Sequence, residues 1–238
     1  MNNFTLPVGY AVEPPKQLVR PGTGTYEGRY VSMSPVNPGQ DVDELFECSH
    51  GSGDFEQLWT YMPYGPFENK NQMKIHLEGC AKSSDPLFFT ISDKASAKKT
   101  GVVSFLNIVE AHQRIELGHI WYSPRVQRTM VNTETIYLML CESFDRLNYR
   151  RVEWKCDALN AKSRLAAQRL GFSFEGIFYK HIINKNHNRD TAWFAMLDND
   201  WANIKANMEK CLYGSEDDFS LTKANKPFLR AVDSGDAL

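Results

Sequence analysis

The segment SPRVQRTMVNTE, residues 123–134, has the residue types of a phosphate-binding loop at the start of a helix. It follows an alternating apolar run and precedes a run with helical periodicity, so a strand, a loop and a helix are expected in that order. The first turn of a helix offers unpaired backbone N–H groups and the positive end of the helix dipole, which together bind phosphate. Asn132 or Thr133 is expected to cap this helix, with Glu134 in its first turn. Further donors for a pyrophosphate are Arg125, Gln127, Arg128 and Thr129.

The loop contains no glycine, the residue that usually lets a ligand approach the backbone closely. Side chains that point away from the ligand leave the same N–H groups accessible, so phosphate binding is still expected. The alternative is a capped helix preceded by a solvated basic loop, which would bind no ligand.

The periodicity of the remaining chain predicts one α+β domain that positions this loop. Gly171 is expected to adopt the left-handed conformation that ends a helix. Residues 1–24 are expected to form an irregular N-terminal arm, and residues 212–238 a polar C-terminal tail. Strands are predicted at residues 26–36, 87–93, 100–110, 114–123, 150–158, 172–183 and 189–197, and helices at 41–50, 69–80, 133–149, 163–172 and 198–212.

The segment EWKCDALNAKSRLAAQRLGFSFEG, residues 153–176, contains N-x-x-S followed by a helix of small residues that ends in L-G-F. With the loop, it resembles the GNAT acyltransferase superfamily, and most closely the branch of ribosomal-protein acetyltransferases of the RimJ/RimL type. The resemblance covers roughly residues 26–205 and implies a GNAT domain over residues 25–211. It implies a mixed, mostly antiparallel sheet that splays between the fourth and fifth predicted strands and is flanked by helices.

The resemblance implies that acetyl-CoA is the cosubstrate and lies in the splay. The family's Q-x-x-G-x-(G/A) pyrophosphate loop falls on residues 127–132, with Met130 and Asn132 at the glycine and small-residue positions. The pantetheine is expected along the strand backbone at residues 121–123, and the helix from Thr133 is expected to face the pyrophosphate. The implied cofactor-binding residues are Trp121, Tyr122, Ser123, Gln127, Arg128, Thr129, Met130, Asn132, Thr133, Asn160 and Ser163.

Glu116 is expected to be the general base, because the resemblance places a catalytic glutamate at this position of the strand. On a regularly alternating strand it shares a face with Gly118, Ile120 and Tyr122, an apolar setting that suits a base. His119 is expected to pack on the other face. The alternatives are that Glu116 forms a salt bridge with Arg114 or Lys99, and that Tyr122 or Asp190 is the base.

Ser163 is expected to relay a proton to the departing thiolate. Many family members use a tyrosine four residues later, where this chain has Ala167. A thiolate whose conjugate acid has a pKa of about 8.5 leaves readily, so a weak acid suffices. Ser163 could instead only cap its helix. A backbone N–H near Tyr122 is expected to stabilise the oxyanion.

The acceptor is expected to be a primary amine: a small amine, an amino acid, a polyamine or a protein N-terminus. In the resembled branch, residues 41–67 border the acceptor site, and here this region is acidic and then aromatic. Both features suit a cation before it loses its proton. Most of these residues could equally belong to a solvated helix face and the core. The expected acceptor-binding residues are Trp59, Tyr61, Tyr64 and Glu116.

Charge and composition indicate which further partners, cofactors and cellular compartments are expected. The net charge of −2 gives no reason to expect nucleic acid, and no apolar run approaches the length of a membrane span. Five dispersed cysteines favour a reducing compartment such as the cytoplasm, and dispersed histidines give no metal site. A monomer or homodimer is expected. A catalytically weak acyl-CoA-binding sensor or partner module is the alternative to an enzyme.

Overall fold

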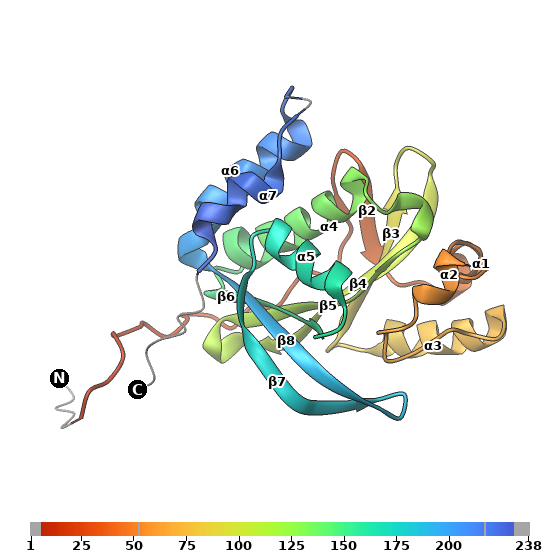
Figure 1. Cartoon of the computed structure of the whole chain (residues 1–238), viewed down its shortest axis with the longest axis horizontal. Helices are drawn as coiled ribbons and strands as arrows, with labels where there is room; N and C mark the ends of the chain where they lie inside the picture. Colours follow the sequence, from red (N-terminus) through yellow and green to blue (C-terminus); the bar gives the residue numbers. More distant parts are fainter. Residues whose placement is uncertain (1–5, 52, 217, 231–238) are drawn as a thin grey trace.

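An eight-stranded sheet forms the centre of the computed structural model, which describes residues 6–51, 53–216 and 218–230 (Figure 1). The strand order is β1-β2-β3-β4-β5-β6-β8-β7, and every neighbouring pair is antiparallel except β5 and β6. The sheet is therefore mixed and mostly antiparallel, as expected. The strands are β1 (Tyr26–Glu27), β2 (Val31–Pro35), β3 (Leu87–Asp93), β4 (Lys98–Val109), β5 (Arg114–Tyr122), β6 (Arg151–Asp157), β7 (Ser173–Asn184) and β8 (His187–Leu197).

Helices cover both faces of the sheet and enclose two separate hydrophobic cores. Val102 and Val103 are successive residues of β4, yet they enter different cores, because side chains alternate across a strand. The core of Val102 lies under α1 (Pro38–Ser49) and α3 (Lys70–Lys82), and the core of Val103 lies under the remaining helices. These are α4 (Met130–Leu140), α5 (Ala161–Arg169), α6 (Asp198–Tyr213) and α7 (Leu221–Asn225). The π-helix η3 (Cys141–Arg146) continues α4 directly. The connections contain α2 (Asp54–Gln57) and the 3₁₀ turns η1 (Glu110–His112), η2 (Pro124–Val126) and η4 (Lys226–Phe228).

The two parallel strands separate halfway along their length. β5 and β6 pair from Arg114↔Arg151 to Leu117↔Trp154, and no partner residues are paired beyond that point. The first predicted strand, residues 26–36, contains both β1 and β2, so the predicted fourth and fifth strands are β5 and β6. The expected splay between them is confirmed.

A β-bulge at His119 overturns the predicted alternation of β5. Its φ is +52°, and the register with β4 shifts between Ser104↔Gly118 and Val102↔Trp121. Tyr122 consequently joins the core that contains Leu117, while Trp121 joins the opposite core. Glu116 and Tyr122 were expected on one face, and the extra residue of the bulge places them on opposite faces.

The arm and the tail each have a part that packs against the domain, at residues 19–22 and at α7. Within the arm, the Gly22 N–H donates to Glu142 Oε1 at 2.7 Å and the Tyr149 hydroxyl donates to Val19 O at 2.7 Å. The expected polar tail from residue 212 contains α7, where Leu221 is a core residue and Asn225 is fully buried. Residues 1–5 of the predicted arm and residues 217 and 231–238 of the predicted tail lie outside the described residues.

Candidate active site

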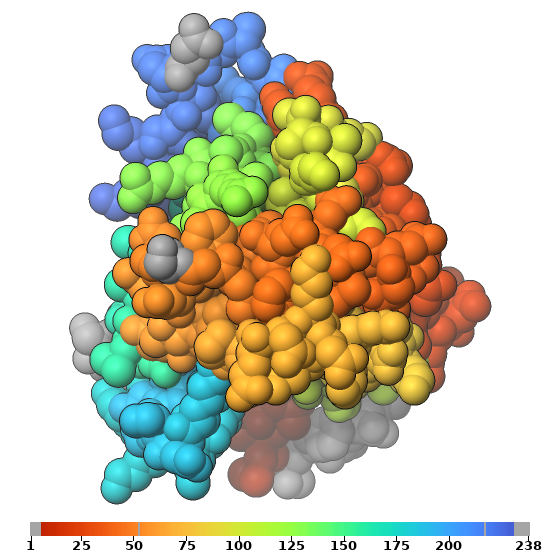
Figure 2. Space-filling view, turned by 90° about the vertical axis from the view of Figure 1, so that its right-hand side faces the viewer, coloured from red at the N-terminus to blue at the C-terminus, as the bar shows by residue number. Residues whose placement is uncertain are grey.

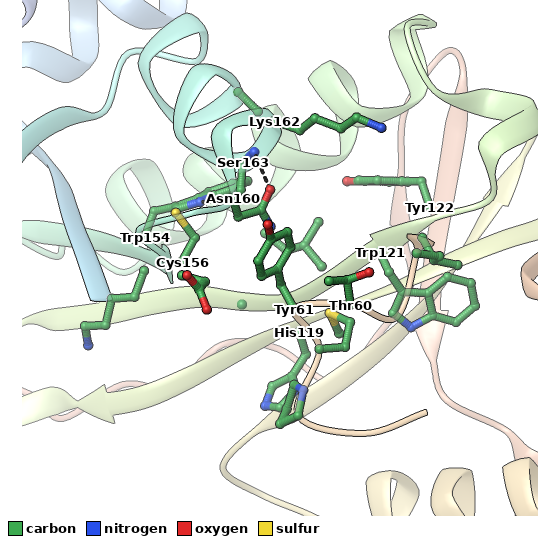
Figure 3. A pocket seen from close by; sticks show the side chains of 18 of the residues that line it. Thr60, Tyr61, His119, Trp121, Tyr122, Trp154, Cys156, Asn160, Lys162 and Ser163 are labelled. Carbon is green, nitrogen blue, oxygen red and sulfur yellow. Dashed lines mark hydrogen bonds between the residues drawn. The ribbon is translucent and has the colours of Figure 1, made fainter. Parts of the chain in front are cut away.

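A cavity of about 700 Å³ opens where β5 and β6 separate (Figure 3). Its walls come from the second half of β5, the end of β6, the start of α5 and the loop after α2. The Tyr61 hydroxyl donates to Leu159 O at 3.3 Å, and Lys185 Nζ donates to Trp59 O at 2.7 Å. These two contacts tie the loop after α2 to the β6–α5 loop and to the β7–β8 hairpin. Figure 2 shows the segment after α1, in orange, beside the hairpin, in cyan.

The backbone conformation of residues 127–132 shows why this loop needs no glycine at the start of α4. α4 begins at Met130, and the Thr129 side chain caps it by accepting from the Val131 N–H at 3.3 Å. The single left-handed residue is Arg128, with φ +65°, two positions before the family's glycine position. Because Met130 is already helical, its position requires no glycine. The expected caps Asn132 and Thr133 are wrong, since the helix starts earlier than predicted.

The loop residues divide into those on the cavity wall and those beside it. Trp121, Tyr122, Gln127 and Asn132 line the cavity, as do Ser163 of α5 and Asn160, which precedes that helix. Arg128, Thr129 and Met130 are exposed in the loop. Thr133 is buried and accepts from Arg169 Nη1 at 3.0 Å, and Ser123 is buried under η2, so neither lies on the wall.

Two polar atoms on this side of the cavity are buried without a protein partner. They are the Tyr122 hydroxyl and Asn132 Oδ1, which form no hydrogen bond within the part of the chain that the structure describes. Burial also raises the pKa of Tyr122, which keeps the hydroxyl protonated at neutral pH. Tyr122 is therefore a poor candidate for the base. Both atoms suit a polar ligand that reaches into the splay, because unpartnered buried polar groups are costly.

Glu116 lies on the cavity wall with one carboxylate oxygen engaged. Its Oε2 accepts from Lys155 Nζ and from Asn107 Nδ2, both at 2.6 Å, and the residue is 6% exposed. Lys155 also contacts Glu153 at 2.9 Å and lies 4.0 Å from the centroid of the Trp193 ring. Oε1 of Glu116 forms no hydrogen bond with any described residue. The salt bridge considered from the sequence exists, but its partner is Lys155 instead of Arg114 or Lys99.

Ser163 is held with its hydroxyl hydrogen available. Its Oγ accepts from Trp154 Nε1 at 3.0 Å, so its own O–H is not needed for that contact. Asn160, not Ser163, caps α5: its Oδ1 accepts from the Ser163 N–H at 3.1 Å (Figure 3). Ala167, at the family's tyrosine position, is fully buried in the core.

The residues expected to contact the acceptor do not all reach the cavity. Tyr61 lines it, and its ring stands in the middle of the view in Figure 3. Trp59 is 1% exposed and donates to Ser49 O at 3.0 Å, so it is a core residue. Tyr64 packs against His76, with ring centroids 4.1 Å apart, and is also absent from the wall.

Two other residues considered from the sequence have structural roles. Asp190 accepts from the Lys180 N–H at 2.7 Å and does not line the cavity, which disfavours it as the base. His119 reaches the cavity wall, but its ring packs 5.6 Å from that of Tyr64 and 4.9 Å from that of Phe88.

Sequence reasoning missed three cations on the cavity wall: Lys155, Lys162 and Arg189. Lys155 lies in the segment 153–176 that was quoted above. Because side chains alternate along a strand, Lys155 points to the face opposite Trp154, and this face of the sheet also carries Glu116. Arg189 comes from a strand far along the chain, and nothing in its local pattern connects it with the loop. No group of three or more His, Cys, Asp or Glu side chains is arranged for a metal within residues 6–51, 53–216 and 218–230. None of the described helices combines the length and apolar character required to cross a bilayer.

Comparison with known proteins assigns the fold to a family. Residues 31–173 match the family model described as an acetyltransferase (GNAT) domain. A GCN5-related N-acetyltransferase from Brucella melitensis is 37% identical, with 90% of this chain and 97% of that chain covered and a TM-score of 0.82. A probable GNAT acetyltransferase from Chromobacterium violaceum ATCC 12472 is 33% identical, with 83% and 100% covered and a TM-score of 0.73.

A third solved structure shares the fold at lower identity. The Microcin C7 self immunity acetyltransferase MccE, in complex with acetyl-CoA and AMP, is 22% identical, with 71% of this chain and 93% of that chain covered and a TM-score of 0.62. No curated protein matches the chain. The matched domain spans the splayed strands, the loop and α5, so the chain belongs to the GNAT family and is an acetyl-CoA-dependent N-acetyltransferase.

Proposed function

We propose that this enzyme acetylates a primary amine by direct attack, with Glu116 as general base and Ser163 as proton donor to the thiolate. The observation that carries the proposal is that both side chains line the same cavity at the splay. The acceptor is a small amine, an amino acid, a polyamine or a protein N-terminus, the last in keeping with the RimJ/RimL-type resemblance.

The cavity offers a consistent set of partners for the coenzyme, which supplies the acetyl thioester. Tyr122, Asn132 and Asn160 contribute polar atoms on its wall, and Gln127 lies at the mouth beside the start of α4. The N–H groups of Gln127, Arg128 and Thr129 donate to no other described residue and suit a pyrophosphate. The buried unpartnered atoms of Tyr122 and Asn132 are the independent sign that a polar ligand belongs there.

The environment of Glu116 suits proton removal. An alkyl amine has a pKa of about 8 to 10, so at neutral pH it must lose a proton before it attacks. Lys155 and Asn107 hold Oε2 in place, which leaves Oε1 to accept that proton. The charge of Lys155 offsets the cost of burying the carboxylate.

Ser163 is oriented for the opposite transfer. Because Oγ accepts from the Trp154 indole, the hydroxyl is prevented from rotating freely and its hydrogen can be directed at the cavity. A serine is a weak acid, but a thiolate needs only a weak one. This arrangement replaces the tyrosine that Ala167 excludes.

A thiol-release assay tests the proposal. The protein is incubated with acetyl-CoA and a panel of amines, and free thiol is measured against the rate of hydrolysis without amine. Release above hydrolysis with at least one amine is expected. Coenzyme binding by calorimetry without release from any amine would support the sensor reading, and absence of both would refute coenzyme binding itself.

A further inference from the structure

The guanidinium of Arg189 is a cation on the cavity wall that has no counter-ion within the described residues. It forms no salt bridge and no side-chain hydrogen bond with any of them, and its Nε is buried without a partner. Arginine carries five N–H donors in a rigid fork that matches a carboxylate. A buried donor left unpaired is costly, so a site with this residue is completed by an anionic ligand.

The other charges of the wall do not supply that anion. Glu116 is already paired with Lys155 at 2.6 Å, and Asp157 Oδ1 accepts from the Leu159 N–H at 2.9 Å. Asp54 is exposed on the loop side of the mouth. Neither Asp54 nor Asp157 forms an ion pair with Arg189 in the described chain, although each lines the same cavity.

Arg189 lies on the side of the cavity that the β7–β8 hairpin forms. It is on β8, beyond the end of β6: Asp157 pairs with Thr191, and the Ala158 N–H donates to Asp190 O at 2.8 Å. The adjoining hairpin tip contacts the loop after α2 through Lys185 and Trp59, and the same loop carries Tyr61. The coenzyme loop at residues 127–132 belongs to a different part of the wall.

The spacing along β8 sets the length of the ligand. Glu116 pairs with Glu153 of β6, which pairs with Ala195 of β8, so Ala195 marks the level of the base. Arg189 is six residues away from Ala195, which is about 20 Å of strand. Even with the reach of both side chains, a free α-amino acid, whose amine and carboxylate share one carbon, is too short to contact both ends.

We propose that the acceptor is an amine that also carries a carboxylate several bonds away, with Arg189 binding the carboxylate while Glu116 receives the proton of the amine. The inference rests on the proposed function, since it names the substrate class for the same site. Arg189 is then a determinant of specificity and takes no part in proton transfer. Lysine would keep the charge but lose the forked geometry.

A chain-length series tests this assignment. The substrates are glycine, β-alanine, γ-aminobutyrate and ε-aminocaproate, each compared with the primary amide of the same length, and kcat/KM is measured by thiol release. The wild type should prefer the longer carboxylates over their amides. Arg189→Gln should lower kcat/KM for the preferred carboxylate by about 10- to 100-fold, and change that for its amide by less than about 2-fold. For Arg189→Lys, kcat/KM for the preferred carboxylate should lie between the values of the wild type and of Arg189→Gln.

Lys180→Gln is the matched control, because it removes a positive charge from the same hairpin at an exposed residue that does not line the cavity. Lys180→Gln should leave kcat/KM unchanged for both the carboxylate and its amide. No carboxylate preference at any length, or an equal loss on carboxylate and amide in Arg189→Gln, would overturn the assignment while leaving the acetyltransferase proposal standing. If no amine is turned over, the proposed function fails instead. Calorimetry with ε-aminocaproate then decides the assignment: binding lost in Arg189→Gln supports it, and no binding to the wild type refutes it.

Discussion

At the scale of single residues, the distinguishing feature of this site is a buried carboxylate whose two oxygens are in different situations. Oε2 of Glu116 is held by Lys155 and Asn107, and Oε1 has no partner among the described residues. Glu153, on the neighbouring strand, also contacts Lys155 but does not line the cavity. The pair therefore offers an internal comparison between a carboxylate that can reach a substrate and one that cannot.

Glu116→Gln should lower kcat by about 10²- to 10⁴-fold at neutral pH, because the amide keeps the shape but cannot accept a proton. Activity should recover partly at high pH, where the amine deprotonates unaided. Acetyl-CoA affinity should change little. Glu153→Gln is the control and should leave the pH–rate profile intact. Near-normal kcat in Glu116→Gln would assign the base elsewhere, with a water chain as the next candidate.

Ser163→Ala should lower kcat more than coenzyme affinity, by up to about 10²-fold, if the hydroxyl serves the leaving thiolate. Trp154→Phe keeps an aromatic ring but removes the N–H that orients Ser163. Trp154→Phe should also lower kcat more than coenzyme affinity, but by a smaller factor than Ser163→Ala. If kcat is unchanged in both variants, Ser163 is only a structural residue of α5.

At the scale of elements, the start of α4 combines a threonine cap with a left-handed arginine. Thr129→Ala should lower the free energy of unfolding by about 1 kcal/mol, the usual effect of a lost cap, measured by denaturant titration. The neighbouring cap on α5 was not foreseen either, because the sequence offers several Ser, Thr and Asn residues near each helix start and cannot choose among them.

Two substitutions of Arg128 separate the roles of its side chain and backbone in coenzyme binding. Arg128→Ala should weaken acetyl-CoA by about 1 to 2 kcal/mol, as expected for one lost charged hydrogen bond. Arg128→Gly removes the same guanidinium but relaxes the left-handed conformation, so it should be more stable than Arg128→Ala. Calorimetry should give similar affinities for the two variants. A loss beyond about 4 kcal/mol in either would contradict binding mainly through backbone N–H groups.

At the scale of the whole molecule, a half-buried histidine of β5, His119, packs against Tyr64 of the loop after α2 and against Phe88 of β3. Burial, helped by the neighbouring His76, lowers the pKa of His119 to about 4. The unfolded chain takes up the proton near pH 6.5, so the stability contributed by neutral His119 is complete above that pH. It is lost progressively as the pH falls from about 6.5 to about 4.

The free energy of unfolding of the wild type should therefore fall between pH 7.5 and pH 5. His119→Asn tolerates the left-handed backbone and cannot titrate, so its stability should fall less over the same interval. Denaturant titrations at the two pH values measure the difference. Equal decreases in the two proteins would assign the acid sensitivity to other groups.

The sequence alone determined the fold class, the order of elements and the place of the loop, because each depends on periodicity and turn residues that are local in the chain. Gly171 is one example: its φ of +100° at the end of α5 is what the L-G-F motif predicts. Most strands lie within a few residues of their predicted bounds for the same reason. The splay was predicted from the family resemblance, and the pairing of β5 and β6, which ends at Leu117↔Trp154, agrees with that prediction.

Only the tertiary structure decided which side chains share a wall. The extra residue of the β-bulge at His119 places Tyr122 on the face opposite Glu116. No local sequence pattern predicts such a bulge. Lys155 reached Glu116 because β5 and β6, nearly 40 residues apart, are neighbours in the sheet. Arg189 entered the cavity because β8 lies beside β6 and extends beyond it. Periodicity fixes the face a side chain takes on its own strand, whereas the cavity is made from strands and loops brought together by the fold.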